Sequence, residues 1–132
     1  MALQHADSAG DTTASVGTGT VAVIGAAPVG YQTFAVKLTD GATYRYRIQD
    51  AANSEWEVNT GVWTASGSTM TRSATPYASS NGGSLVSFSA GTKAIVIVMT
   101  AADADSLASS VAAAAASAAL AQTYSNLILA GS

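Results

Sequence analysis

Two glutamates, Glu55 and Glu57, come closest in this chain to a catalytic pair of acids. They alternate on one predicted strand, so their carboxyl groups would lie about 7 Å apart, a spacing that suits an inverting glycosidase. No neighbouring feature indicates a cleft, however, and two arginines give both acids a simpler use. An antiparallel hairpin can pair Arg47 with Glu55 and Arg45 with Glu57 across its two strands. We therefore predict structural ion pairs, no catalytic residues and no enzymatic activity.

The other candidate sites lack the sequence context that their chemistry needs. GTGTVA at 17–22, followed by Asp40, matches a dinucleotide-binding fingerprint, but β-branched residues follow it where a helix should begin. His5 is the single histidine and has no neighbouring partner for a triad or a metal site. Asp103 and Asp105 lack the further oxygen ligands of a calcium loop and suit the start of a helix. We expect no cofactor and no metal.

The composition excludes several classes of function. The chain has 132 residues and a net charge of −3, and charged residues make up only 10 % of it. So few lysines and arginines cannot neutralise many phosphates, and we expect no binding to nucleic acid. The absence of cysteine excludes disulfides and thiolate metal sites. The start of the chain lacks the features of a secretory signal, and no apolar run is long enough to cross a bilayer, so we expect a protein made in a cytoplasm without a membrane partner.

The chain divides into three stretches of different composition. Residues 1–17 are small and polar with no apolar period, which predicts a flexible or partner-ordered arm. Residues 18–101 contain short β-branched runs separated by turn residues, a spacing typical of an antiparallel β-sandwich or a barrel-like domain. Residues 94–99 are apolar on both faces and indicate a central strand. Residues 102–132 are rich in alanine, which predicts a C-terminal α-helix after a mainly β fold.

Alternation within the β-domain assigns the faces of its strands. Residues 34–38 alternate between apolar and other side chains and predict a strand, and SLVSF at 84–88 predicts a further strand that pairs with the last one. In the hairpin, Tyr46 is expected opposite Trp56, with Val58 on the same buried face. The two glutamates are then expected on the outer face, beside the arginines.

The predicted helix begins with a capping motif and carries two stripes of apolar residues. TAAD at 100–103 has the spacing of a capping box, with Asp103 in the position that Glu usually holds. One stripe has the heptad spacing of a coiled-coil seam and consists of Leu107, Val111, Ala114, Ala118, Ala121 and Ile128. A second stripe lies beside it and consists of Leu120, Tyr124 and Leu127. Because alanine buries little surface but permits close approach, we predict a parallel homotrimeric coiled coil, with a helix folded back on its own sheet as the alternative.

The most specific pattern in the chain is EWEVNTGVWTASGSTMTR at 55–72, followed by SSNGGSLVSFSAGTK at 79–93 and an apolar strand. The pattern resembles a β-domain that recurs in structural proteins of tailed bacteriophages. The resemblance covers roughly residues 18–101. Its matching residues are Trp56-Glu57-Val58, Gly61, Thr64 to Gly67, Arg72, Ser79 to Leu85 and Phe88 to Lys93. The chain departs from the family pattern at Asn59, where glycine is usual, and after the last strand, where the usual proline is missing.

The resemblance implies a structural role without enzymatic activity. Such domains often stand near the N-terminus of tail fibres or in minor virion proteins, and the alanine-rich tract is similar to the shafts of side tail fibres. We therefore expect the particle-proximal attachment region of a trimeric tail fibre, located in the virion and bound to a tail adaptor or nozzle protein. Such a protein would act in virus assembly and host attachment.

Two alternative functions remain open from the sequence. A capsid decoration or head-fibre protein would use the same β-domain to bind the capsid shell. A glycan-binding module is the weaker alternative, because only Tyr31, Tyr77 and Trp63 are aromatic residues without an expected place in the core. These three residues form no obvious platform for a sugar.

Overall fold

A long antiparallel hairpin forms the centre of the fold in the computed structural model, which describes residues 3–100 and residue 103. Its strands are β4 (Thr43–Asp50) and β5 (Glu55–Thr64). Tyr44, Tyr46 and Ile48 alternate along β4 and are buried, as predicted, because side chains of a strand point alternately to its two faces. We call the face of the sheet that carries the tyrosines the inner face and the opposite one the outer face.

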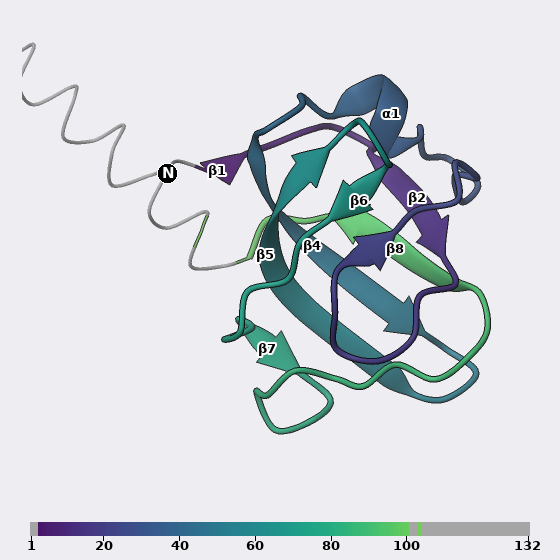
Figure 1. The fold of residues 1–132 in the computed structure, drawn as a ribbon, viewed down its shortest axis with the longest axis vertical. Coiled ribbons are helices and arrows are strands. Elements are labelled where there is room, and N and C mark those ends of the chain that lie inside the picture. The colour runs from purple at the N-terminus through teal and green to yellow at the C-terminus, as the bar shows by residue number, and fades with distance from the viewer. Residues whose placement is uncertain (1–2, 101–102, 104–132) are drawn as a thin grey trace, which may run out of the picture. The chain divides into compact units, whose positions relative to one another are not determined.

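Six shorter strands surround this hairpin: β1 (Leu3–Gln4), β2 (Gly10–Thr13), β3 (Val21–Ala22), β6 (Thr69–Met70), β7 (Ala78–Ser79) and β8 (Lys93–Ile97). The order across the sheet is β2-β8-β4-β5-β6-β3 (Figure 1). β1 pairs in parallel with the start of β4, and β7 pairs with the first half of β5. β2 and β3 stand at the two ends of this strand order. A single bridge between Thr13 of β2 and Val23, just after β3, connects these two ends.

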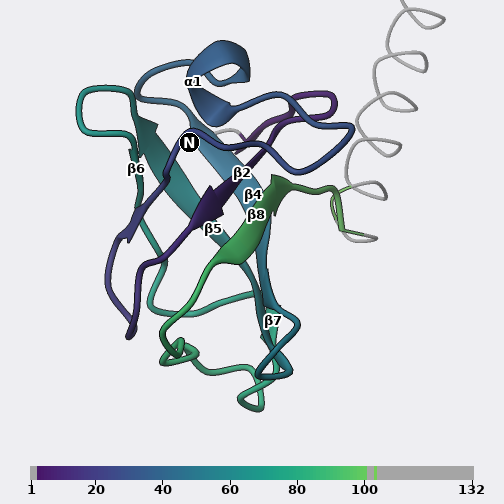
Figure 2. The ribbon, with the colours of Figure 1, turned by 90° about the vertical axis from the view of Figure 1, so that its right-hand side faces the viewer.

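The structure confirms a mainly β fold with a curled, largely antiparallel sheet in the form of a half-barrel. Figure 2 shows β2, β8, β4 and β5 side by side, and all eight described strands belong to one sheet. The barrel-like alternative therefore describes the domain better than a sandwich of two sheets. β8 lies between β2 and β4, which confirms the prediction of a central strand within 94–99.

The predicted ion pairs across the hairpin are wrong. Arg47 lies opposite Val58 and not opposite Glu55, and Arg45 lies opposite Thr60 and not Glu57. The observed register differs from the predicted one by three residues, and an odd shift exchanges the two faces of a strand. The glutamates of β5 therefore point to the inner face, whereas Trp56 and Val58 lie on the outer face.

The turn between β4 and β5 explains the register. Residues 51–54 form a four-residue turn, so that Asp50 pairs with Glu55. The Asp50 carboxylate accepts hydrogen bonds from the backbone N–H of Asn53 at 3.3 Å and from its Nδ2 at 2.8 Å. Ser54 completes the turn with a φ of +53°. A local polar turn thus determines the pairing, and not the charges along the strands.

The hydrophobic core packs against the inner face. Trp63, which the sequence did not assign to the core, is fully buried at its centre and meets Phe34 edge to face with ring centroids 5.6 Å apart. An aromatic pair of this kind contributes about 0.5–1.5 kcal/mol beyond the area that it buries. Besides these rings and the inner face of β4, the core consists of Ala9, Val21, Leu38, Met70, Val86, Phe88 and Ile95.

The prediction that residues 1–17 form an arm is wrong for the part that the structure describes. β2 pairs along its whole length with β8, and Asp11 and Thr13 are buried. The Thr13 hydroxyl donates to the Ala22 carbonyl at 2.6 Å. The apolar period is absent because this strand buries polar side chains that bind backbone groups, and hydropathy does not detect such a strand.

Two predicted strands are also absent. Residues 34–38 instead contain the short helix α1 (Phe34–Lys37), because Phe34 and Leu38 are one helical turn apart and both face the core, while Val36 is 71 % exposed. Residues 84–88 form no strand; Phe88 makes an isolated bridge with Gly17. Their backbone is held by a side chain of β5, as described below.

Replacing Gly61 by alanine is expected to destabilise the fold by about 3 kcal/mol, at the upper end of the cost of overpacking. A Cβ atom at Gly61 would overlap the carbonyl oxygen of Thr71, a backbone atom that also accepts a hydrogen bond from the Tyr46 hydroxyl. Urea unfolding of the two proteins measures the difference. The matched control is Gly19→Ala, because a Cβ there meets no atom within 4 Å. Equal stability of the two variants would contradict the close approach at Gly61.

The chain has two units, Met1–Val98 and Met99–Ser132, and the sheet belongs to the first. In the second unit, the backbone N–H of Thr100 donates to Asp103 Oδ2 and the backbone N–H of Asp103 donates to Thr100 Oγ1, both at 3.1 Å. These reciprocal bonds confirm the predicted capping box. The helix predicted to follow it lies outside the described residues. In the part of the chain that is described, no helix has the length and apolar character to span a bilayer.

Candidate functional site

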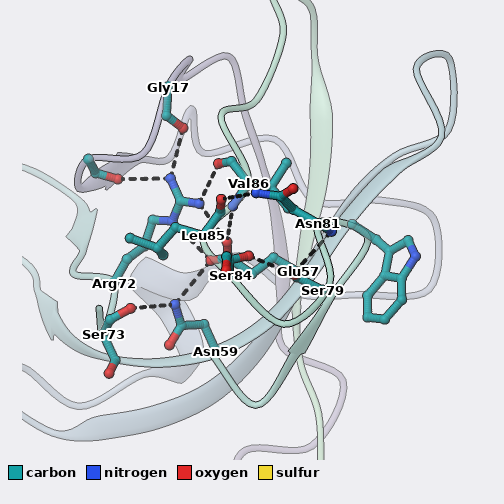
Figure 3. Close-up of polar contacts among 12 residues, drawn as sticks. Gly17, Glu57, Asn59, Arg72, Ser73, Ser79, Asn81, Ser84, Leu85 and Val86 are labelled. Atoms are coloured by element: carbon teal, nitrogen blue, oxygen red, sulfur yellow. Dashed lines mark hydrogen bonds and ion pairs between the residues drawn. The ribbon is translucent and has the colours of Figure 1, made fainter. Parts of the chain in front are cut away.

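Glu57 of β5 forms a buried ion pair with Arg72 beneath the inner face of the sheet (Figure 3). Their side chains are 0 % and 2 % exposed. Arg72 Nη2 donates to Glu57 Oε1 at 2.6 Å and Arg72 Nε donates to Oε2 at 3.0 Å, so the contact is bidentate. The guanidinium also donates to the carbonyls of Gly17 at 2.8 Å and of Val86 at 2.7 Å, and it lies over the Phe88 ring.

The Glu57 carboxylate accepts two further hydrogen bonds. The backbone N–H of Val86 donates to Oε1 at 2.8 Å, and Asn59 Nδ2 donates to Oε2 at 3.0 Å. The same Asn59 amide also donates to the Ser73 carbonyl at 2.9 Å. We call Glu57, Asn59 and Arg72 the Glu57 cluster. Because each carboxylate oxygen accepts two hydrogen bonds and is buried, the cluster holds chain segments together and leaves the acid no contact with a substrate.

The environment of the Glu57 cluster changes the acidity of two groups in a consistent way. Burial raises the pKa of the Glu57 carboxyl, but the hydrogen bonds from Arg72, Val86 and Asn59, together with the arginine charge, outweigh burial and hold that pKa below its ordinary value of 4.5. Burial, and then the negative charge of Glu57, raise the pKa of the nearby Tyr46 hydroxyl well above 10.0, and the Arg72 charge opposes this only in part. At neutral pH, Glu57 is therefore ionised and Tyr46 is a neutral donor.

The lowered pKa of Glu57 predicts a specific loss of stability in acid. Because the folded-state pKa lies below 4.5, the stabilising effect of this carboxylate is fully present above pH 4.5 and is lost as the pH falls through the lower, folded value. Glu57→Gln removes the titrating group. The difference in free energy of unfolding between the wild type and this variant should therefore shrink as the pH falls from about 6 to about 3, as urea titrations measure. A difference that stays constant over this range would contradict the ionised state of Glu57.

Asp11 of β2 is a second buried carboxylate with a structural role. Its Oδ1 accepts hydrogen bonds from the backbone N–H groups of Thr12, Gly25 and Ala26 at 2.8, 2.9 and 3.1 Å. Its Oδ2 accepts from the backbone N–H of Phe34 at 3.3 Å. One side chain thus fixes both ends of the loop between β3 and α1.

On the outer face, two arginines of β4 lie over aromatic rings. The guanidinium carbon of Arg47 is 5.1 Å from the centroid of the Trp56 ring, and that of Arg45 is 4.9 Å from the centroid of the Tyr77 ring. Each such contact contributes about 0.5–1 kcal/mol at an exposed position. The arginines thus stabilise the outer face through the rings, in place of the predicted glutamate partners.

A polar pocket of about 350 Å³ lies where the turn between β4 and β5 approaches the segment 79–89. We call it the polar hollow; it is lined by Ser54, Glu55, Ser80, Asn81, Val86 and Ser87. The segment 79–89, named here the serine loop, is attached to the sheet at Glu55, whose carboxylate oxygens accept hydrogen bonds from the backbone N–H and the hydroxyl of Ser89 at 3.0 and 3.2 Å. Glu55, unlike Glu57, therefore remains beside an open space.

The structure brings none of the predicted site residues into their predicted pairs. Arg45 and Arg47 lie on the outer face of the sheet, and Glu55 and Glu57 point to the inner face. The predicted seam and the stripe beside it lie outside the described residues; they comprise Leu107, Val111, Ala114, Ala118, Ala121, Ile128, Leu120, Tyr124 and Leu127.

Sequence reasoning missed the partnership of Glu57 with Arg72 and the role of Asp11. Fifteen residues separate Glu57 from Arg72, and no local period connects them. The resemblance to phage structural domains had marked both residues as parts of one pattern, and this was the available signal. For Asp11 the sequence contains no comparable signal, because its partners are backbone groups.

The fold and the Glu57 cluster define a small β half-barrel whose buried charges hold together chain segments that are distant in sequence. Among residues 3–100 and residue 103, no group of three or more His, Asp or Glu side chains is arranged to hold a metal ion. Comparison of the chain with protein-family models, with curated proteins and with solved structures found no match.

Proposed function

We propose that the chain is a non-enzymatic structural protein of a tailed-phage virion, and specifically the particle-proximal attachment region of a trimeric tail fibre. The observation that carries the proposal is that residues of the phage-like sequence pattern meet at the ion pair between Glu57 and Arg72. Glu57, Arg72 and Phe88 come from three separate pieces of that pattern, and they meet in one buried site. The pattern is therefore explained by the needs of the fold, without a catalytic role for its charged residues.

The use of the carboxylates further supports a structural role. Glu57 and Asp11 accept four hydrogen bonds each, all from groups of the described chain. A catalytic acid needs an oxygen within hydrogen-bond reach of its substrate, whereas both of these carboxylates are fully buried. A rigid β-domain whose buried carboxylates are hydrogen-bonded within the domain suits a protein that binds other proteins. The capsid decoration protein remains the alternative, since it would use the same body.

The trimer is tested by sedimentation of the full chain with two matched substitutions. Ala118→Glu places a charge in the predicted seam, whereas Ala116→Glu places the same charge on the opposite side of the predicted helix. We expect a trimer for the wild type and for the 116 variant, and a monomer for the 118 variant. Equal behaviour of the two variants, or a monomeric wild type, would contradict the proposed shaft.

The place in the particle is tested by counting copies in purified virions with quantitative mass spectrometry. A tail fibre predicts a small number of copies in a multiple of three, because fibres are trimers attached to one tail. A capsid decoration predicts many copies that follow the symmetry of the shell. Absence of the protein from virions would overturn both assignments.

A further inference from the structure

The polar hollow has a chemical character that the proposed function does not use. Five of its six lining residues contribute a hydroxyl, an amide or a carboxylate, and the sixth, Val86, is only 4 % exposed. Figure 3 shows Asn81 and Val86 on the same side of the Glu57 cluster. Its volume of about 350 Å³ lies near the lower end of the range for small-molecule sites, which suits a ligand of one ring.

The walls of the polar hollow are fixed before any ligand binds. Within the serine loop, the Ser79 hydroxyl donates to the Ser84 carbonyl at 2.6 Å, and Asn81 Nδ2 donates to the Leu85 carbonyl at 3.0 Å. The loop is attached to β5 where the Trp56 N–H donates to the Ser80 hydroxyl at 3.0 Å. It is anchored again at Glu57 and at Glu55, as described above. A site built in this way loses little conformational entropy on binding.

Several polar atoms of the polar hollow remain available for a ligand. Within the described chain, the hydroxyls of Ser54 and Ser87 and the side-chain oxygen of Asn81 have no hydrogen-bond partner. Each carboxylate oxygen of Glu55 accepts one hydrogen bond and retains a further lone pair. The hollow thus offers mainly acceptors, together with hydroxyls that both donate and accept.

This set of groups selects a class of ligand. Several acceptors in fixed positions match a molecule with several hydroxyl donors on a rigid ring. The negative charge of Glu55, with no cationic side chain in the lining, disfavours an anionic ligand.

We propose that the polar hollow is a binding subsite for a neutral monosaccharide unit, held by Glu55, Asn81 and Ser87. The inference stands on the pocket and does not depend on the virion assignment. It also differs from the sugar platform sought in the sequence, because the exposed aromatic residues Tyr31 and Tyr77 take no part in it.

The proposal is tested by amide chemical-shift titration of the full chain with methyl glycosides of glucose, galactose, mannose and N-acetylglucosamine. At least one glycoside should cause saturable shifts at residues 54–55 and 80–87, with a Kd on the order of 1 mM, as expected for a shallow site. Ser87→Leu, which fills the hollow, should weaken this binding at least tenfold. Ser66→Leu, at an exposed turn remote in sequence from the hollow, should leave it unchanged.

The titration also distinguishes the other possible occupants. If no glycoside causes saturable shifts at these residues, the proposal is wrong. If the Ser87→Leu variant binds as well as the wild type, the sugar lies elsewhere and the proposal is equally wrong. Shifts caused by calcium chloride and by no glycoside would identify a cation site instead. The amide spectra of both variants report whether they are folded, so loss of binding is not confused with unfolding.

Discussion

Replacing Arg72 by methionine is expected to lower the free energy of unfolding by about 3–5 kcal/mol. The substitution keeps a long side chain over Phe88 but leaves the fully buried Glu57 carboxylate without its opposite charge. It also removes the donors that the carbonyls of Gly17 and Val86 now bind. Urea unfolding measures the loss. At 37 °C such a variant is expected to populate unfolded chains, because a small domain has few kcal/mol to lose.

Two comparisons separate this effect from a general effect of losing an arginine. Arg47→Met removes a guanidinium that lies over a ring on the outer face, and we expect a loss of about 1 kcal/mol or less. The double variant Glu57→Gln with Arg72→Met removes both charges of the buried ion pair and should be more stable than Arg72→Met alone. If the double variant is the less stable of the two, the cost does not arise from an unpaired carboxylate.

Replacing Asp11 by alanine is expected to cost about 4 kcal/mol, or about 1 kcal/mol for each of the four backbone N–H groups that lose their acceptor. The loop between β3 and α1 should then detach, because both of its ends are held by this side chain. Urea unfolding measures the stability. Amide hydrogen exchange should show the fastest new exchange at residues 25 and 26 and at Phe34.

Asp40→Ala is the matched control, because its carboxylate accepts a hydrogen bond from a single backbone N–H, that of Ala65 at 2.9 Å, at an exposed turn. We expect this control to lose about 1 kcal/mol or less. If Asp11→Ala lowers the free energy of unfolding no more than Asp40→Ala does, the four hydrogen bonds of Asp11 do not stabilise the fold as predicted. The loss of stability in Asp11→Asn should fall between those of Asp11→Ala and Asp40→Ala, because the amide keeps one acceptor oxygen.

The sequence predicted the elements that depend on local chemistry. Alternation located β4, and a run of residues that is apolar on both faces located β8. The capping box at Thr100 and Asp103 was predicted from the four-residue motif TAAD and is present with both of its hydrogen bonds. Each of these signals lies within a few residues of the structure that it specifies, so no knowledge of the fold was needed.

The interior polar groups were not predictable in the same way. Glu57 looks like a surface residue of an amphipathic strand, and its burial depends on an arginine that the fold brings to it. The register followed from four turn residues and the Asp50 side chain, whereas charge pairing favoured a different answer. Asp11 and Thr13 gave β2 no apolar period at all. Long-range partners therefore decided the burial of Glu57 and the pairing of β2, whereas a local turn decided the register of the hairpin.

The position of β8 has a consequence for synthesis of the protein. Gly10 of β2 pairs with Val96 of β8. β2 is synthesised early and β8 last among the described strands, so β2 cannot pair until β8 has been made. A ribosome must release residue 97 before the half-barrel can form, and until then the edges of β2 and β4 are exposed. Such a high contact order favours folding in milliseconds to seconds rather than microseconds. Nascent chains that stall before β8 are therefore the species most exposed to aggregation and to chaperones.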